Sequence, residues 1–303
     1  MGDPTPTPGL PPFALDIELP PPPDVSGISR KWLDVSYATL SPAQRLDVYL
    51  PEEGDGPFAV VFYIHGGGFA IGDKRDGMLT PGLAALDRGY AVVSVNYRMS
   101  GEAAFPAAVQ DVKAALRWVK ANSAGFMLDP GRIGAFGGSA GGYLAAMLGL
   151  SAGVALFDDP RLGNEEQSDE VQVVVDWFGP TDFLAMDAQL ADSGLPPCDH
   201  DSPDSPESIW LGGTITDVPE RVALANPISY VTTAMAPMLI QHGTLDCLVP
   251  YQQSVELAKA IEERVGAARF ELELLEGAGH GDPRFETLEN MRRVFDFMDK
   301  FLH

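Results

Sequence analysis

The stretch GAFGGSAGGYLAAML, residues 134–148, places five glycines around a single serine, Ser139. Residues 137–141 form a G-x-S-x-G motif that follows a pattern typical of a strand and opens a pattern typical of a helix. This context predicts a sharp turn in which glycines avoid collisions with the neighbouring backbone and the serine hydroxyl is held where it can react. The plain alternative is a glycine-rich turn without chemistry.

Outward from this stretch, strand patterns alternate with helical ones. The expected strands are residues 31–38, 44–51, 58–64, 90–97, 132–137, 171–178, 238–243 and 270–277. The expected helices are residues 107–124, 140–153, 251–266 and 285–302. Strands separated by helices of about 10 to 20 residues indicate a mostly parallel sheet. The sequence therefore predicts the α/β class, with helices on both faces of one central sheet and an antiparallel pairing of the first two strands.

The length of 303 residues suits one large domain. The predicted divisions are a Pro-rich N-terminal segment at 1–29 and one domain over residues 30–303. Within the domain, residues 185–212 are rich in Pro, Asp and Ser and show no periodicity. Because this segment is too long for a simple connector, it is expected to form a short lid or loop over the edge of the sheet where ligands bind.

The composition is acidic, with 43 Asp and Glu residues against 20 Lys and Arg residues and a net charge of −23. Such a surface repels nucleic acid and anionic membranes, so neither is an expected partner. No apolar run approaches the roughly 20 residues that cross a bilayer. The start of the chain as written lacks the basic and apolar regions of a signal peptide.

A reactive serine needs a base, and the base needs an acid that orients it. In a site built on a strand–turn–helix serine, these follow along the chain in the order serine, acid, histidine. His280, between glycines just after the last expected strand, fits the base. Asp246, which follows the strand at 238–243, is the expected acid, although an aspartate there also suits a turn or a helix cap. Asp182, which follows the preceding strand, is the rival acid.

Three successive glycines, Gly66 to Gly68, follow the strand at 58–64. Glycines in this place allow backbone N–H groups to point at a tetrahedral intermediate, together with the N–H group after the serine. The expected oxyanion hole is therefore made by Gly67, Gly68 and Ala140. His65 is expected to hold the shape of this loop by hydrogen bonding.

The motifs HGGGF (65–69), GGSAGG (137–142), HGTLDCLVP (242–250) and GAGHG (277–281) together resemble the α/β-hydrolase serine esterases of the hormone-sensitive-lipase type. The closer likeness is to the branch of bacterial feruloyl and acetyl-xylan esterases, and it covers roughly residues 30 to 303. The resemblance implies Ser139 as nucleophile, His280 as base and Asp246 as acid. One departure is Gly138, where the commoner lipase-type motif has an acid. Members with large caps carry long N-terminal helices, so the Pro-rich start of this chain favours a short lid.

The two cysteines, Cys198 in the expected lid and Cys247 beside the expected acid, are either free thiols or one disulfide. The resemblance favours the disulfide, which would tie the lid to the acid loop. A disulfide would indicate secretion or the periplasm, and free thiols leave a cytoplasmic location open.

Four aromatic residues stand beside the motifs: Phe69, Tyr143, Trp177 and Phe178. Aromatic side chains dominate both ligand pockets and cores, so each is a candidate for lining the substrate pocket or for packing the interior.

The predicted function is a serine carboxylesterase that acts without a metal or cofactor. Its expected substrates are short-chain, acetyl or feruloyl esters, either small molecules or groups linked to polysaccharide. One alternative is an amide hydrolase, such as a formamidase, on the same three residues. The other is a ligand-binding protein without catalysis, and such proteins usually lack one of the three. The sequence does not indicate an oligomeric state.

Overall fold

The computed structural model describes residues 19–303, so most of the Pro-rich segment predicted at 1–29 lies outside the described residues. The described chain folds around an eight-stranded sheet with the order β1-β2-β4-β3-β5-β6-β7-β8. The strands are β1 (Lys31–Ser36), β2 (Arg45–Tyr49), β3 (Phe58–Ile64), β4 (Ala91–Val95), β5 (Leu128–Gly138), β6 (Val173–Trp177), β7 (Met238–Gly243) and β8 (Phe270–Leu275).

The sheet is mostly parallel, as the sequence predicted. β2 pairs antiparallel with both β1 and β4, and every other neighbouring pair is parallel. The register places Ile64 opposite Gly137 and Gly138 opposite Trp177. The loops that leave β3, β5 and β6 therefore start side by side at the carboxyl edge of the sheet, which is where open α/β sheets bind ligands.

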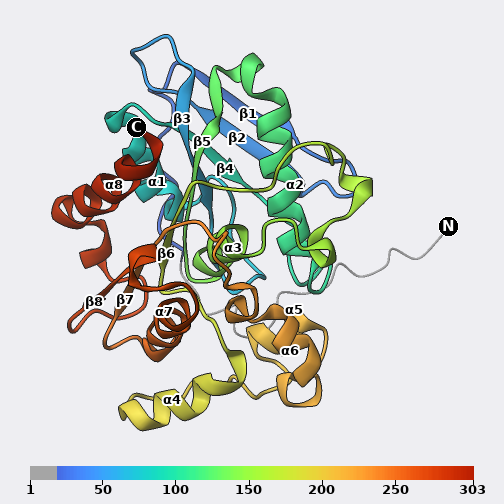
Figure 1. The fold of residues 1–303 in the computed structure, drawn as a ribbon, viewed down its shortest axis with the longest axis vertical. Helices are drawn as coiled ribbons and strands as arrows, with labels where there is room; N and C mark the ends of the chain where they lie inside the picture. The colour runs from blue at the N-terminus through green and yellow to red at the C-terminus, as the bar shows by residue number, and fades with distance from the viewer. Residues whose placement is uncertain (1–18) are drawn as a thin grey trace.

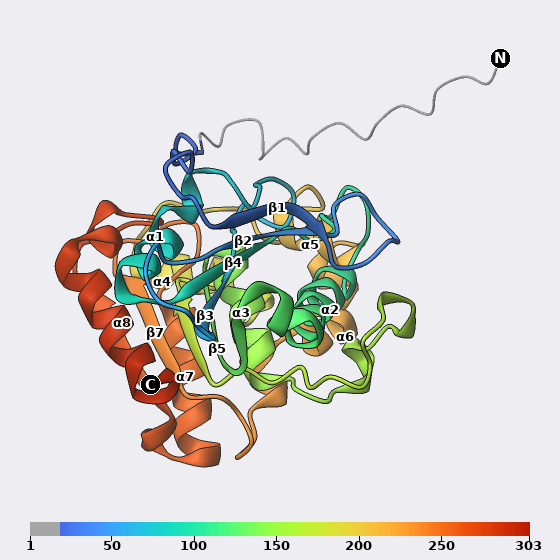
Figure 2. The same ribbon diagram turned by 90° about the horizontal axis from the view of Figure 1, so that it is seen from above.

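Helices cover both faces of the sheet. They are α1 (Thr80–Leu83), α2 (Ala107–Asn122), α3 (Ala140–Leu150), α4 (Met186–Ser193), α5 (Pro206–Leu211), α6 (Pro219–Ala225), α7 (Gln252–Val265) and α8 (Leu288–Leu302). The buried side chains of α2, α3 and α7 belong to one hydrophobic cluster, and those of α8 belong to a second. Figure 2 shows α2 and α8 on opposite sides of the sheet. Two cores separated by a sheet of apolar strands are typical of a doubly wound domain.

The segment between β6 and β7 includes the residues that are expected to form a short lid or loop. Residues 185–212 show no sequence periodicity, yet they carry the short helices α4 and α5. Each is too short for a hydrophobic repeat to be read, and each ends at a glycine in the left-handed conformation, Gly194 or Gly212. Figure 1 shows α4 at the lower left and α5 and α6 beside each other at the lower right, all away from the C-terminus of the chain. We call residues 179–237 the insertion.

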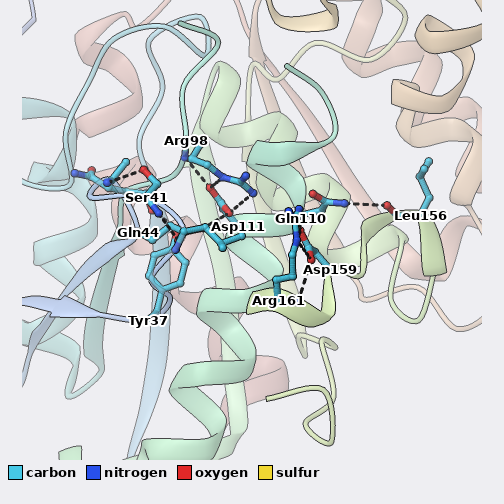
Figure 3. A network of polar contacts seen from close by, with 12 residues as sticks. Tyr37, Ser41, Gln44, Arg98, Gln110, Asp111, Leu156, Asp159 and Arg161 are labelled. Atoms are coloured by element: carbon cyan, nitrogen blue, oxygen red, sulfur yellow. Dashed lines mark hydrogen bonds and ion pairs between the residues drawn. The ribbon is translucent and has the colours of Figure 1, made fainter. Parts of the chain in front are cut away.

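A buried carboxylate fixes α2 against the sheet. Asp111 is fully buried, and its oxygens accept hydrogen bonds from Gln44 Nε2, from the Arg98 backbone N–H and from the Arg98 guanidinium, each at 2.8 Å. Figure 3 shows Gln44 and Arg98 converging on Asp111 from outside α2. A buried carboxylate with all its partners rigidifies the chain around it, here the segments before β2 and after β4.

Among residues 19–303, no helix is long and apolar enough to cross a membrane.

Candidate active site

Ser139 occupies the turn between β5 and α3 in a strained backbone conformation. Its φ of 57° and ψ of −126° are rare for a residue with a side chain. Its N–H group donates to the Trp177 carbonyl at 2.9 Å, and its carbonyl accepts from Tyr143 N–H at 3.0 Å. Neighbouring structure therefore holds the strain on both sides of the serine, as expected where strain serves a site.

The glycines of the motif are needed because the turn is packed tightly against its neighbours. A Cβ on Gly137 would overlap the backbone of Gly141, and a Cβ on Gly141 would overlap the Ile64 carbonyl oxygen. A Cβ on Gly142 would overlap Asp176 Oδ1. Side chains at these three positions would therefore collide with their neighbours, as the sequence predicted, and glycine avoids the collision.

Three side chains from three strand ends form one hydrogen-bonded chain. His280 lies in the loop after β8, and its Nδ1 is 2.7 Å from Asp246 Oδ2 in the loop after β7. Its Nε2 is 2.9 Å from Ser139 Oγ. Because an ionised carboxylate only accepts, His280 Nδ1–H donates to Asp246 and His280 Nε2 accepts from the serine hydroxyl. This arrangement activates a serine for nucleophilic attack.

Asp246 is held ionised although it is fully buried. Burial alone raises its pKa, but the charge of His280 and the hydrogen bonds to His242 and His280 outweigh burial and hold the pKa of Asp246 well below its usual range. Its second oxygen, Oδ1, accepts N–H donors from Leu248 and Val249 at 2.9 Å each. These bonds fix the carboxylate in place for His280.

The histidine at the end of β7 holds this acid loop in place. His242 Nε2 is 2.8 Å from the Val249 carbonyl and 3.4 Å from Asp246 Oδ2. His242 Nδ1 is 2.7 Å from Ser254 Oγ in α7. The imidazole therefore joins the loop to the helix that follows it.

The rival acid, Asp182, has a different task. Its side chain caps the 3₁₀ turn Phe183–Ala185 by accepting the N–H of Leu184 at 3.2 Å. The histidine is paired with Asp246 instead, so the structure brings together the three residues that the sequence favoured.

The glycine loop after β3 lies against the serine. A Cβ on Gly66 would be 3.4 Å from Ser139 Cβ. Gly67 and Gly68 have φ of 102° and 57°, and no hydrogen bond from the N–H group of either is found within residues 19–303. Ala140 is the first residue of α3, where backbone N–H groups lack partners inside the helix. Gly66 thus brings the glycine loop to Ser139, and Gly67, Gly68 and Ala140 stay the predicted oxyanion donors.

His65 holds this loop by packing and hydrogen bonding. Its Nδ1 is 2.8 Å from the Gly66 carbonyl, and its ring stacks on Tyr97 at 4.6 Å. The Tyr97 hydroxyl in turn donates to the His65 carbonyl at 3.1 Å. Burial lowers the pKa of His65, which favours the neutral ring that this packing requires.

The four aromatic candidates belong mainly to the interior. Phe69, Tyr143 and Trp177 are almost completely buried. The Trp177 Nε1–H group donates to Gln241 Oε1 at 2.7 Å, and the Tyr143 hydroxyl donates to the Ala225 carbonyl at 2.7 Å. These three residues therefore pack the interior and do not line a substrate pocket. Phe178 is also buried, and its ring packs edge-on against His280 at 4.7 Å, so it supports the base.

The favoured disulfide is absent from the structure, in which Cys198 and Cys247 are free thiols. Cys198 lies in the insertion and Cys247 directly follows Asp246, and both residues are partly exposed.

Sequence reasoning missed Trp210. This fully buried residue of α5 lies against four aromatic rings, those of Phe69, Phe105, Tyr143 and Phe183. The available signal was a single tryptophan in an otherwise polar segment, which marks a point where the segment enters the core.

The sheet order, the strained serine turn and the Ser–His–Asp chain together define an α/β-hydrolase. The family model BD-FAE matches residues 46–261, more than half of the chain. The chain therefore belongs to the BD-FAE family, which confirms the esterase resemblance drawn from the motifs.

Individual relatives agree with this assignment. The chain is 32% identical over 226 residues to "Probable carboxylic ester hydrolase LipM" of Mycobacterium tuberculosis, covering 73% of this chain and 49% of that protein. It is 30% identical over 288 residues to esterase LipQ of the same organism, covering 92% of this chain and 65% of that protein. The chain thus spans about half to two thirds of these curated relatives.

A solved structure matches over nearly its whole length. It is a truncated form of a carbohydrate esterase from gut microbiota, with a TM-score of 0.79 and 31% identity. The match covers 92% of this chain and 98% of that one. The α/β-hydrolase fold is thereby shared with a related protein.

Proposed function

We propose that this chain is a serine carboxylesterase. The observation that carries the proposal is the hydrogen-bonded chain from Asp246 through His280 to Ser139, beside a loop in which the N–H groups of Gly67 and Gly68 have no partner among residues 19–303. The three reacting side chains meet at the carboxyl edge of one sheet, and Gly67, Gly68 and Ala140 are the proposed anion-binding groups. The relatives of this chain are named as esterases, which supports the same chemistry here.

In the proposed reaction, Ser139 Oγ attacks the ester carbonyl carbon while His280 Nε2 takes the hydroxyl proton. The carbonyl oxygen becomes an oxyanion and accepts N–H donors from Gly67, Gly68 and Ala140. The intermediate collapses, the C–O bond to the alcohol breaks, and His280 returns the proton to the leaving oxygen. Water then attacks the acyl carbon while His280 takes a proton from it. The bond from the acyl carbon to Ser139 Oγ breaks, His280 returns the proton to that oxygen, and the carboxylic acid leaves. Asp246 stays ionised and stabilises the imidazolium that forms twice in the cycle.

The proposed substrates are short acyl esters, including acetyl or feruloyl groups on carbohydrate. The likeness to a carbohydrate esterase that is matched along nearly its full length supports this class. The surface charge of −23 also favours neutral esters, since anionic ones would be repelled.

The test is a hydrolysis panel on purified protein. It runs from p-nitrophenyl acetate to long acyl chains, with methyl ferulate, acetylated xylan and N-formylkynurenine. The proposal predicts turnover of the short esters and its loss in Ser139→Ala, with an unchanged thermal unfolding midpoint. Retained hydrolysis in Ser139→Ala would refute the nucleophile, and turnover of N-formylkynurenine alone would establish the amide hydrolase instead.

A further inference from the structure

The residue after the oxyanion glycines holds an unusual backbone conformation. Phe69 has φ of 60°, in the left-handed region that side chains rarely adopt, and it directly follows Gly68. Such a conformation persists only where surrounding structure maintains it. Because Gly68 is bonded directly to Phe69, contacts that fix Phe69 also restrain the end of the glycine loop.

Two kinds of contact fix Phe69. Its carbonyl accepts the Ser100 N–H group at 2.8 Å. Its ring lies face to face on Trp210, with centroids 4.2 Å apart and planes 14° apart, and meets Tyr143 edge-on at 5.5 Å. The tryptophan ring is the nearer of the two and lies almost parallel to the phenyl ring, so the stack restrains the plane of that ring.

Trp210 is itself held firmly. Its carbonyl accepts the Phe105 N–H group at 2.8 Å, and its ring meets Phe105 at 5.1 Å. It lies in α5, whose buried Glu207 pairs with His200 of the preceding loop at 3.2 Å. The stack on Phe69 thus joins the insertion to the loop that borders Ser139.

We propose that Trp210 is a positioning residue for the oxyanion hole, acting through Phe69 on the N–H groups of Gly67 and Gly68. This inference rests on the proposed esterase function. It assigns the insertion a part in the chemical step. A displacement of a catalytic group by about 1 Å costs roughly 100-fold in rate. Loss of the stack should therefore weaken the binding of the oxyanion more than the binding of the ground-state substrate.

The structure supplies a conservative variant. Trp210 Nε1 is buried and has no hydrogen-bond partner among the described residues. Trp210→Phe therefore removes no hydrogen bond and keeps an aromatic ring on Phe69, whereas Trp210→Leu removes the stack. Trp118→Leu is the matched control, because Trp118 of α2 packs on Phe126 at 5.5 Å, in the 3₁₀ turn Ser123–Phe126 before β5.

The experiment compares the three variants with wild type by kinetics on p-nitrophenyl acetate. For Trp210→Leu we expect kcat to fall by about 10-fold or more while KM changes little. A short alkyl trifluoromethyl ketone, whose adduct with Ser139 carries an oxyanion, should lose affinity by a similar factor. Trp210→Phe should recover most of both losses, and Trp118→Leu should retain wild-type values.

Hydrogen exchange of residues 64–72 gives a readout that does not depend on activity. We expect faster exchange there in Trp210→Leu and not in Trp118→Leu. The proposal would be overturned if Trp210→Leu kept the wild-type kcat, inhibitor affinity and hydrogen exchange. A change confined to KM would overturn it as well. If Trp210→Leu does not fold, Trp210→Met replaces it under the same expectations. A wild-type protein that hydrolyses no ester would refute the proposed function, while exchange would still decide whether Trp210 holds the loop.

Discussion

The hydroxyl of Tyr143 donates a hydrogen bond of 2.7 Å to the carbonyl oxygen of Ala225. Tyr143 lies in the first turn of α3, directly after the serine turn, and Ala225 is the last residue of α6 in the insertion. Both residues are fully buried. The bond therefore ties the helix behind Ser139 to the insertion, which gives Tyr143 a structural role in place of the pocket role considered from the sequence.

Tyr143→Phe tests this structural role. The substitution removes the donor and leaves a buried carbonyl without it, so the free energy of unfolding should fall by about 1 to 3 kcal/mol. KM for short esters should stay at the wild-type value, because the ring that packs on Phe69 is retained. The measurements are urea unfolding and steady-state kinetics. A raised KM with unchanged stability would return Tyr143 to the pocket.

Asp246→Asn should reduce kcat by about 10⁴-fold, because the amide no longer holds His280 in the tautomer that accepts the serine proton. KM should change little, since Asp246 is buried and does not reach substrate. Esterase kinetics measure the loss.

Asp182→Asn is the matched control for that substitution. Asparagine caps a helix start as well as aspartate does, so the 3₁₀ turn at Phe183 should survive and kcat should remain near wild type. If Asp182→Asn were the variant that lost activity while Asp246→Asn kept it, the assignment of the acid would be wrong.

Much of this arrangement follows from local sequence. The alternation of strand and helix patterns along the chain predicts a mostly parallel sheet. Continuous apolar runs such as β3 fit this sheet, because its strands are buried on both faces. The glycines around Ser139 predict the elbow, since a side chain at Gly137 or Gly141 would overlap backbone. The order serine, acid, histidine then selects Asp246 and His280.

The rest depends on contacts between distant parts of the chain. Whether Tyr143 faces a pocket or the core is decided by Ala225, which is 82 residues away in sequence. The burial of Trp210 is decided by Phe69 and Phe105, on two other loops. Helices α4 and α5 are too short for a hydrophobic repeat to indicate them. Tertiary packing of this kind leaves no periodic signal along the sequence.

The two cysteines offer a direct chemical check. Both side chains are partly exposed and unbonded, so native protein should react at Cys198 and Cys247 with a small alkylating reagent. Intact mass should rise by two adducts without prior reduction. A product with no adducts until reductant is added would instead establish the disulfide that the family resemblance favoured.

Asp176 of β6 gives the molecule a pH-dependent stability. The side chain is fully buried, with Oδ1 accepting the Gly179 N–H group at 3.0 Å. Burial raises the pKa of Asp176 to about 6, although the charge of His242 and the Gly179 bond lower it in part. The folded state then holds this proton more tightly than the unfolded chain does. The contribution of Asp176 to the free energy of unfolding is therefore fully present below pH 4. It is lost as the pH rises through 6.

Asp176→Asn isolates this contribution. The amide keeps the shape and the acceptor for Gly179 but carries no charge at any pH. Relative to wild type, the variant should therefore gain stability between pH 4 and pH 7, by up to about 3 kcal/mol for a shift of about two pH units. Urea unfolding at several pH values measures the difference, in which the titration of all other groups cancels. Asp192→Asn, at an exposed position on α4, is the control and should run parallel to wild type. A parallel curve for Asp176→Asn as well would mean that Asp176 is charged in the folded protein near pH 5, with a partner that stabilises the anion.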